Sequence, residues 1–424
     1  MRILFISNSS AMSGAPAALL NLVLALRERG HECAVMLPGS GGALPKKLKA
    51  AGIRMFAEQK YSLSIYPRCL NPLKRRRRRK KLEHRELLMS YMGYVLDCFG
   101  PDIVHTNVGP LDFAAEACRL KGIPHVWHLR EYQDLDFGMK FYPSQEKFME
   151  MIHGDWNRCI AITADIFSHF KLGIRDRVIY DGVFDERESD EKNAAAQERR
   201  LLGAEEKADG GNGEVSQCEP RNAESGGRKY FLYAARIEKA KGFDILARAF
   251  RKFAPEHEGW QLIVAGRPCG FYAFRWKLFC RRHLPKGSVK FLGQSDRVAE
   301  LMREAAATVV PSRYEAFGFT TAEAMLQGCT VIGRDTAGTR EQFDNGLRST
   351  GREIGLRFGG DSSAKASKLA EQLCARMSEV ASAPGGKELA AMHAAAKRTV
   401  KENYGACRCA LQVEEFYNEI LSER

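Results

Sequence analysis

The sequence predicts an α/β protein built from two doubly wound domains that face each other across a cleft. Short apolar strands alternate with amphipathic helices almost from end to end, and the same rhythm restarts after Arg228. Strands that are apolar on both faces and are joined through helices predict parallel sheets with right-handed crossovers. Because ligands of open α/β sheets bind outside the carboxyl ends of the strands, the functional site is expected in the cleft.

The first domain is expected over residues 1–185 and begins with a strand at residues 3–7. A glycine-bearing loop follows, and then a helix that Pro16 can start and Gly30 can end. The apolar face of this helix repeats at spacings of three and four residues and consists of Leu19, Leu22, Val23 and Leu26. Further strands are predicted at residues 32–37, 102–106, 125–129, 159–163 and 177–180.

The second domain is expected over residues 229–403, followed by a last helix over residues 404–424. The strands of this domain are predicted at residues 230–236, 260–266, 289–293, 307–312 and 330–333. The apolar face of the last helix consists of Leu411, Phe416, Tyr417 and Ile420. Residues 186–228, between the domains, hold hardly any large apolar side chains. Such a segment cannot bury enough surface to offset its ordering entropy, which predicts a flexible insertion or linker.

The composition excludes several classes of protein. The chain has 424 residues, of which 45% are hydrophobic and 28% charged, so it is not a mostly disordered chain. No run of 18 apolar residues predicts a membrane-spanning helix, and the five-residue apolar stretch at the N-terminus is too short for the core of a signal peptide. The 12 cysteines form no CxxC pair, which predicts reduced thiols, no metal site and a cytoplasmic location.

Residues 311–328, PSRYEAFGFTTAEAMLQG, are the richest in chemistry. Glu315 and Glu323 are separated by seven residues, Gly318 lies in the turn between them, and a helix is expected to begin near Thr320. Loop amides and a helix N-terminus together form a partly positive cup that fits a phosphate or diphosphate. Two other readings stay open at this point: Thr320 and Glu323 also match a capping box, and Glu315 can be a solvated loop residue.

A second candidate site lies at residues 233–250, YAARIEKAKGFDILARAF. Arg236 ends a predicted strand, Lys241 starts the next helix, and Gly242 permits a close approach of the backbone. Two cations at one strand-to-helix corner can hold a diphosphate without a metal, at about 1.5–3 kcal/mol for each desolvated contact. The alternative is a solvated turn, where Lys and Arg are usually found.

These segments resemble the retaining glycosyltransferases of family 4, which have the GT-B fold of two Rossmann-like domains. The resemblance covers most of the chain, including RILFISNSSAMSGAPAALLNLVLALRERGHECAV, PDIVHTN, CIAIT, VIYDGV, AARIEKAKGFDIL, VKFLG, VVPSRYEAFGFTTAEAMLQGCTVI and AGTREQFDNG. Departures from the family pattern are SGAPA in the first loop, Arg267 in AGRPCG, and Arg130 and Glu131 in WHLREY.

The resemblance implies a role for each matching position. His128 and Glu315 would be catalytic, with Glu315 facing the donor sugar. The donor-binding residues would be Gly14, Arg236, Lys241, Phe317, Gly318, Phe319, Thr320 and Glu323, with Glu323 on the ribose hydroxyls. The family also implies a C-terminal helix that crosses back to the N-terminal domain, transfer with retention, and no metal or other cofactor.

The resemblance further implies the partners. A nucleotide-sugar donor would give its sugar to a glycan or a lipid-linked acceptor, in the synthesis of a cell-surface polysaccharide or a glycolipid. Two alternatives are a nucleotide-sugar epimerase of GT-B shape and a basic nucleic-acid-binding protein. The set of Arg236, Lys241, Glu315 and Glu323 resembles the transferases rather than the epimerases, and a nucleic-acid-binding protein leaves this set unexplained.

A run of eight cations stands out in a chain whose net charge is +13. It consists of Lys74, Arg75, Arg76, Arg77, Arg78, Arg79, Lys80 and Lys81. A solvated loop, a nucleic-acid contact and a contact with anionic lipid all fit such a run. No aromatic residues alternate with the cations, so nucleic acid is not the expected partner. The membrane reading is favoured, and it predicts a cytoplasmic protein that attaches peripherally to the inner face of the membrane.

Overall fold

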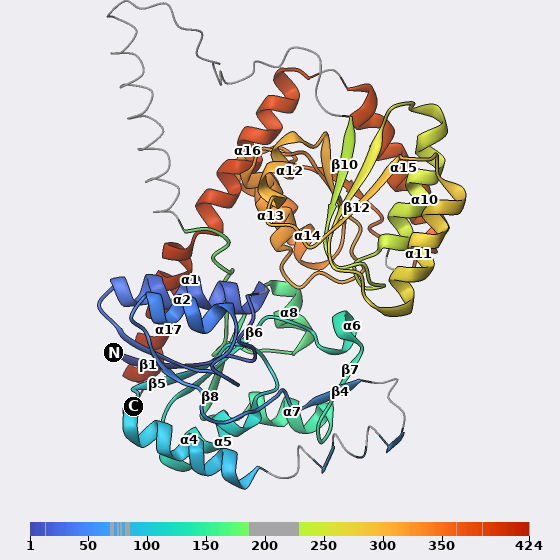
Figure 1. The fold of residues 1–424 in the computed structure, drawn as a ribbon. Coiled ribbons are helices and arrows are strands. Elements are labelled where there is room, and N and C mark those ends of the chain that lie inside the picture. Colours follow the sequence, from blue (N-terminus) through green and yellow to red (C-terminus); the bar gives the residue numbers. More distant parts are fainter. Residues whose placement is uncertain are drawn as a thin grey trace, which may run out of the picture.

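Two parallel sheets, one from each half of the chain, form the framework of the protein (Figure 1). The computed structural model describes residues 1–12, 14–67, 72–73, 76, 79–80, 85–185, 229–361, 363–383 and 385–423. The expected insertion at residues 186–228 lies outside the described residues, as do Lys74, Arg75, Arg77, Arg78 and Lys81 of the basic run. The remaining members of that run, Arg76, Arg79 and Lys80, are exposed.

The N-terminal sheet has seven parallel strands in the order β3-β2-β1-β5-β6-β8-β9. These strands are β1 (Arg2–Ile6), β2 (Glu32–Met36), β3 (Arg54–Phe56), β5 (Ile103–Thr106), β6 (His125–Leu129), β8 (Asn157–Ala161) and β9 (Arg177–Val178). The helices of this half are α1 (Gly14–Glu28), α2 (Ala43–Ala50), α4 (Glu86–Phe99), α5 (Asp112–Lys121), α6 (Asp134–Phe137), α7 (Gln145–Ile152) and α8 (Ala164–His169). A separate antiparallel ribbon pairs β4 (Ile65–Pro67) with β7 (Met139–Phe141).

The C-terminal sheet has six parallel strands in the order β12-β11-β10-β13-β14-β15. They are β10 (Tyr230–Ala234), β11 (Gln261–Ala265), β12 (Val289–Gly293), β13 (Ala307–Val310), β14 (Val331–Arg334) and β15 (Leu356–Phe358). The helices of this half are α10 (Phe243–Phe253), η2 (Ala254–Glu256), α11 (Gly270–His283), α12 (Val298–Glu304), α13 (Phe319–Leu326), α14 (Ala337–Thr350), α15 (Ala366–Ser382) and α16 (Lys387–Asn403).

The continuous apolar runs arise because both faces of each sheet are covered by helices. In β1, Ile3 and Phe5 join the core under α1, whereas Leu4 and Ile6 join the core on the opposite face. All four side chains are fully buried. Successive side chains of a strand point to opposite faces, so a strand buried on both sides must be apolar throughout.

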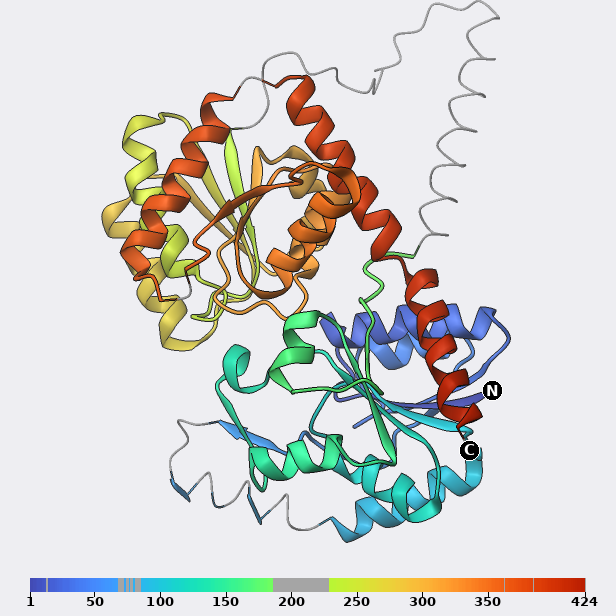
Figure 2. The same cartoon turned by 180° about the vertical axis from the view of Figure 1, so that it is seen from behind.

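The last helix, α17 (Ala406–Ser422), returns to the N-terminal half and lies along it in both views (Figures 1 and 2). Val413, Phe416 and Tyr417 share one core with Leu19 and Val23 of α1. The prediction that Leu411 belongs to this apolar face is wrong: Leu411 is 41% exposed, because helical spacing places it on the side of α17 opposite Val413 and Tyr417. An ion pair between Arg29, directly after the end of α1, and Glu414 of α17 also joins these segments. The expected GT-B architecture, with its returning C-terminal helix, is therefore confirmed.

Every strand expected from the sequence is present, but four further strands were not expected. These are β3, β4, β7 and β15, each of three residues. β3 and β15 are edge strands, and β4 and β7 form their own ribbon. Such short segments bury only part of their side chains and therefore carry no continuous apolar pattern. Among the described residues, no helix has the length and apolar character needed to cross a membrane.

Candidate active site

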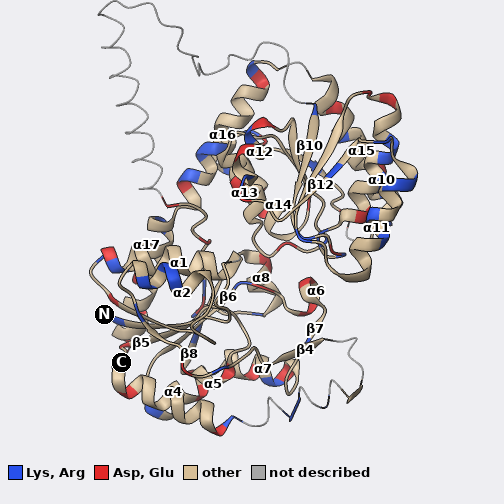
Figure 3. Ribbon diagram, viewed as in Figure 1, with Lys and Arg blue, Asp and Glu red and all other residues tan. Residues whose placement is uncertain are grey.

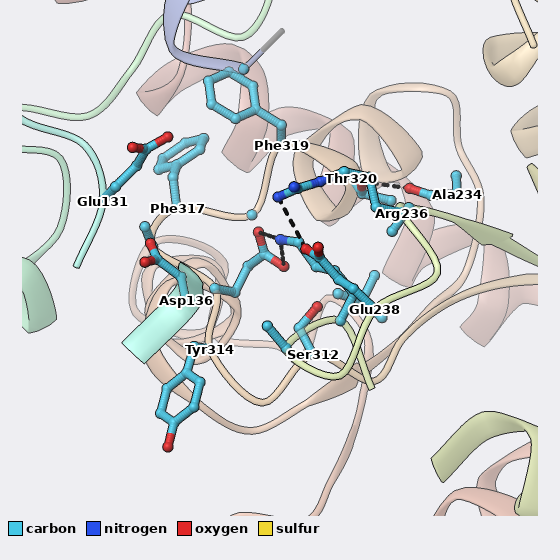
Figure 4. A pocket seen from close by; sticks show the side chains of 18 of the residues that line it. Glu131, Asp136, Ala234, Arg236, Glu238, Ser312, Tyr314, Phe317, Phe319 and Thr320 are labelled. Atoms are coloured by element: carbon cyan, nitrogen blue, oxygen red, sulfur yellow. Dashed lines mark hydrogen bonds and ion pairs between the residues drawn. The ribbon is translucent and has the colours of Figure 1, made fainter. Parts of the chain in front are cut away.

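A cavity of about 480 Å³ lies where the two halves face each other (Figure 4). From the N-terminal half, it is lined by the start of α1, by the loop after β6 together with the end of α6, and by Ile162 and Asp181. The C-terminal half contributes the loops after β10 and β13 and the start of α13. The cavity thus lies at the carboxyl ends of parallel strands, where the sequence predicted the site.

The loop from Glu315 to Gly318 is held by the first turns of α14. Gln342 Nε2 donates to the carbonyl oxygens of Phe317 (2.7 Å) and Gly318 (3.1 Å), and Gly338 N donates to the carbonyl of Glu315 (2.9 Å). Gly318 has φ +99°, a left-handed conformation that disfavours any side chain, and it is the N-cap of α13. The first amides of α13 have no partner within the helix, so this end of the cavity can accept an anion.

The capping-box reading of Glu323 is wrong. α13 begins at Phe319, so Thr320 is inside the helix, and its hydroxyl donates to the carbonyl of Ala234 (3.1 Å). Glu323 is exposed on α13, one turn beyond Thr320, and does not line the cavity.

Both predicted cations lie at the cavity, and each is paired with a carboxylate. Lys241 Nζ lies 2.8 Å and 2.9 Å from the two carboxylate oxygens of Glu315. Arg236 Nη2 lies 3.0 Å from Glu238 Oε1, and its guanidinium carbon lies 5.3 Å from the ring centre of Phe137, which belongs to the other half. The solvated-turn alternative is therefore wrong for Lys241, which is 23% exposed, whereas Arg236 is 44% exposed and remains in contact with solvent.

The segment from the end of β6 to α6 provides an acidic wall, of which the sequence pointed only to Glu131, as a departure from the family pattern. Glu131, Asp136 and Phe137 line the cavity, and Figure 4 shows the two carboxylates on the side opposite Arg236. Gln133, at φ +70°, donates from Nε2 to Glu131 Oε2 (2.7 Å), and Tyr132 N donates to Asp136 Oδ2 (3.0 Å). Burial, with the neighbouring Asp136, raises the pKa of Glu131 to about 7, and burial raises that of Asp136 to about 6. Glu131, Asp134 and Asp136 all lie within seven positions of the end of β6, and this acidic cluster could have been noticed in the sequence.

His128 lies beneath the cavity wall and is not among the residues that line it. Its side chain is fully buried, with Nδ1 3.1 Å from both His105 Nε2 and Arg130 Nη2. His105 Nδ1 lies 2.5 Å from the hydroxyl of Tyr417 on α17. Burial and the nearby Arg130 hold the pKa of His128 well below its usual range, so the imidazole is neutral. Arg130 and its ion-pair partner Asp181 do line the cavity and lie between it and His128.

The remaining predicted residues meet where the two halves approach. Gly14 is the first residue of α1, and a Cβ there would lie 3.9 Å from the ring of Phe319. Phe317 is buried in the core that joins the two halves, which includes Tyr404. Gly14, Phe317, Gly318, Phe319 and Thr320 all line the cavity.

Direct hydrogen bonds join the two halves beside the cavity. Thr163 Oγ1 donates to the carbonyl of Ala316 (3.0 Å). Glu341 accepts from Ala164 N at the start of α8 (2.9 Å) and from the hydroxyl of Tyr180 (2.8 Å). Two adjacent residues of α14 therefore have different partners. Glu341 binds the N-terminal half, and Gln342 binds the loop of residues 315–318. Within the described part of the chain, no group of His, Cys, Asp and Glu side chains is arranged to hold a metal ion.

The GT-B fold consists of two doubly wound halves that face each other, with a cavity at the ends of their strands. Many glycosyltransferases have this fold. The family model described as Glycosyltransferase Family 4 matches residues 12–187, and that described as Glycosyl transferases group 1 matches residues 217–373. Together they cover most of the chain, which belongs to the group 1 glycosyltransferases of the GT-B fold. The resemblance noted in the sequence is thereby confirmed.

Curated relatives match parts of the chain. A lipopolysaccharide core biosynthesis mannosyltransferase of Rhizobium meliloti, LpsB, is 29% identical over 29% of this chain and 36% of its own length. Another enzyme described in the same way, LpcC of Rhizobium leguminosarum, is 29% identical over 44% of this chain and 50% of its own length. The chain spans about a third to a half of the length of these relatives.

Solved structures match nearly the whole chain. Anabaena HepE, in complex with UDP and glucose, has a TM-score of 0.68 and 18% identity, covering 99% of this chain and 100% of its own. A glycosyltransferase from Rickettsia africae has a TM-score of 0.70 and 16% identity, covering 100% of this chain and 99% of its own. At sequence identities of 16% and 18%, this similarity shows that the chain shares the fold of these proteins.

Proposed function

We propose that the protein transfers a sugar from a nucleotide-sugar donor to a glycan or lipid-linked acceptor, with retention of configuration and without a metal. The observation that carries this proposal is the pair of Lys241 and Glu315, which lies in the interdomain cavity beside the N-terminus of α13. A cation, a carboxylate and unpaired helix amides in one cavity match the diphosphate and the hydroxyls of such a donor.

Each donor-side residue has a role in this proposal. Arg236 and Lys241 bind the diphosphate, together with the amides at Phe319 and Thr320. Negative charge grows on the diphosphate as the anomeric bond breaks, and fixed cations and helix amides stabilise it as it develops. Binding of the diphosphate draws Lys241 from Glu315, which leaves that carboxylate to accept hydrogen bonds from the donor sugar. Glu323 binds the ribose hydroxyls, which its exposed place on α13 permits.

The acidic wall is proposed as the acceptor side. Glu131 and Asp136 face the cavity from the N-terminal half, opposite the donor cations. Carboxyl groups accept hydrogen bonds from the hydroxyls of a glycan. His128 does not contact substrate in this proposal; it positions Arg130 and Asp181, which close the floor of the cavity.

The acceptor and the location are proposed on further grounds. LpsB and LpcC are described as enzymes of lipopolysaccharide core biosynthesis, which supports a cell-surface glycan as the product. HepE is described in complex with UDP and glucose, which supports a nucleotide-sugar donor. The basic run at residues 74–81 supports a peripheral attachment to the cytoplasmic face of a membrane.

A screen of nucleotide sugars tests the proposal. At a hundred times its dissociation constant, the true donor adds about 2.7 kcal/mol to the free energy of unfolding, which a thermal shift detects. Donor cleavage and transfer to lipid-linked or oligosaccharide acceptors are then followed with that donor. No shift with any nucleotide sugar, or release of an epimerised nucleotide sugar in place of nucleoside diphosphate, contradicts the proposal.

A further inference from the structure

The helix α11 carries two largely exposed phenylalanines, Phe271 and Phe274. Phe271 is 78% exposed and Phe274 is 63% exposed, and their ring centres lie 6.2 Å apart. The opposite face of the helix is buried through Ala273, Trp276 and Cys280. Large apolar side chains that stand together on a surface mark a place where something binds.

Basic side chains surround the two rings. Residues 259–295 contain no acidic residue and seven basic ones, which are Arg267, Arg275, Lys277, Arg281, Arg282, Lys286 and Lys290. Helical spacing places Arg275, Arg281 and Arg282 on the same side as Phe271 and Phe274. All five are exposed, and we call them the α11 face. None of the three guanidinium groups has an ion-pair partner among the described residues, and Figure 3 shows the basic segments along α11.

The α11 face lies next to the rim of the cavity. Ile237 N donates to the carbonyl of Arg267 (3.0 Å), which ties the loop before α11 to the loop that carries Arg236. In Figures 1 and 2, α11 lies at the end of the C-terminal half that points toward the N-terminal half, on the same side of the molecule as α6. A surface that binds the α11 face would therefore lie close to the cavity.

We propose that the α11 face is a membrane-contact surface that binds anionic lipid headgroups, separate from the basic run at residues 74–81. Interfacial helices combine exposed aromatic rings, which enter the headgroup region, with cations that attract anionic lipid. A convex helix face favours a flat lipid surface over a nucleic-acid strand, which binds in a basic groove. This inference does not depend on sugar transfer, since it concerns only attachment.

Sedimentation of the 424-residue chain with vesicles tests the proposed membrane contact. The vesicles are made of phosphatidylcholine, with and without phosphatidylglycerol. Replacing Arg275, Arg281 and Arg282 with Gln is expected to weaken binding to anionic vesicles roughly hundredfold at low salt, at about fivefold per cation. The variant in which Phe271 and Phe274 are replaced with Ser is expected to bind anionic vesicles at low salt but not at high salt, because only electrostatic attraction then remains. The matched control removes the same charge from α16, through Lys387→Gln, Lys397→Gln and Lys401→Gln.

Each variant is also compared in a background in which Arg75 to Arg79 are Gln, so that the basic run cannot mask the effect. Equal vesicle binding by the wild type and both α11 variants overturns the proposal, as does an equal loss in the α16 control. Absence of vesicle binding, with an oligonucleotide bound through the same arginines, also overturns it. Nucleotide binding in the α11 variants is measured alongside, so that a failure of attachment is distinguished from a failure of the proposed activity.

Discussion

Lys241 and Glu315, 74 positions apart in the chain, meet so that one ammonium group contacts both oxygens of one carboxylate, at 2.8 Å and 2.9 Å. The side chains are 23% and 14% exposed, and the pair opens onto the cavity between the halves. A half-buried cation held by a half-buried carboxylate is ready to exchange that partner for a stronger anion. The predictions below concern this contact and the loops around it.

Replacing Lys241 with Met removes the charge and keeps most of the side-chain length. We expect the affinity for the nucleoside diphosphate of the donor to fall about 10- to 100-fold, the equivalent of about 1.5–3 kcal/mol for one charge-assisted contact. Calorimetric titration measures the change. Lys239→Met, an exposed neighbour, is the matched control. Equal affinities for the wild type and Lys241→Met would remove Lys241 from the diphosphate site.

The carboxylates Glu315 and Glu323 are expected to differ in what they bind. Glu323→Gln should weaken binding of the free nucleoside diphosphate because it loses contacts with the ribose. Glu315→Gln should leave that binding nearly intact and lower kcat, because its contacts with the sugar strengthen as the bond breaks. Titration and steady-state kinetics of both variants separate the two roles. Full activity of Glu315→Gln would exclude it from catalysis.

Stability provides a second readout for Glu323. Its side chain is exposed and does not cap α13. Replacement by the neutral Gln is therefore expected to leave the free energy of unfolding unchanged. A loss of stability together with unchanged nucleotide affinity would contradict the ribose assignment.

Gln342→Ala is expected to displace the loop that carries Glu315. The side chain is buried and donates to two carbonyl groups of that loop, which the variant leaves unsatisfied. We expect a loss of about 1–3 kcal/mol in the free energy of unfolding, and a fall in kcat greater than the rise in KM. Gln372→Ala, at an exposed position of α15, is the control. An unchanged kcat in a folded Gln342→Ala variant would show that the loop keeps its geometry without this side chain.

The raised pKa of Glu131 predicts that stability falls as the pH rises. The folded protein holds this proton up to a pKa of about 7, whereas the unfolded chain loses it near the ordinary value of 4.5. The folded state thus binds more protons between these values, so raising the pH across this window destabilises it. Asp136, at about 6, acts in the same direction.

Thermal unfolding of the wild type and Glu131→Gln across this pH range measures the effect. The variant is expected to lose less stability than the wild type as the pH rises, because its side chain does not ionise. Glu150→Gln, an exposed change on α7, should follow the wild type. Parallel curves for the wild type and Glu131→Gln would show that Glu131 has an ordinary pKa.

The sequence by itself determined the architecture and the donor side of the cavity. Strand and helix periods are local, so eleven strands and most of the apolar face of α17 could be located from apolar spacing alone. Leu411, also expected on that face, is exposed, and the buried Val413 was not predicted. Arg236, Lys241, Glu315 and Gly318 each lie in a short motif at a strand end, and the parallel topology brings such ends to one edge. The proximity of these four residues at the cavity could therefore be predicted from the order of strands and helices along the chain.

Only the tertiary structure decided what the other residues contact. His128 lies one residue before the end of β6, whose carboxyl end faces the cavity. Its imidazole nevertheless lies beneath the wall, because Arg130 and Asp181 pair above it and Tyr417 contacts it through His105. Gln342 holds a loop 24 and 25 positions away, and Glu131 and Asp136 enter the wall through a left-handed turn at Gln133. These positions depend on how separate elements pack and on the backbone between them, and neither leaves a periodic trace in the sequence.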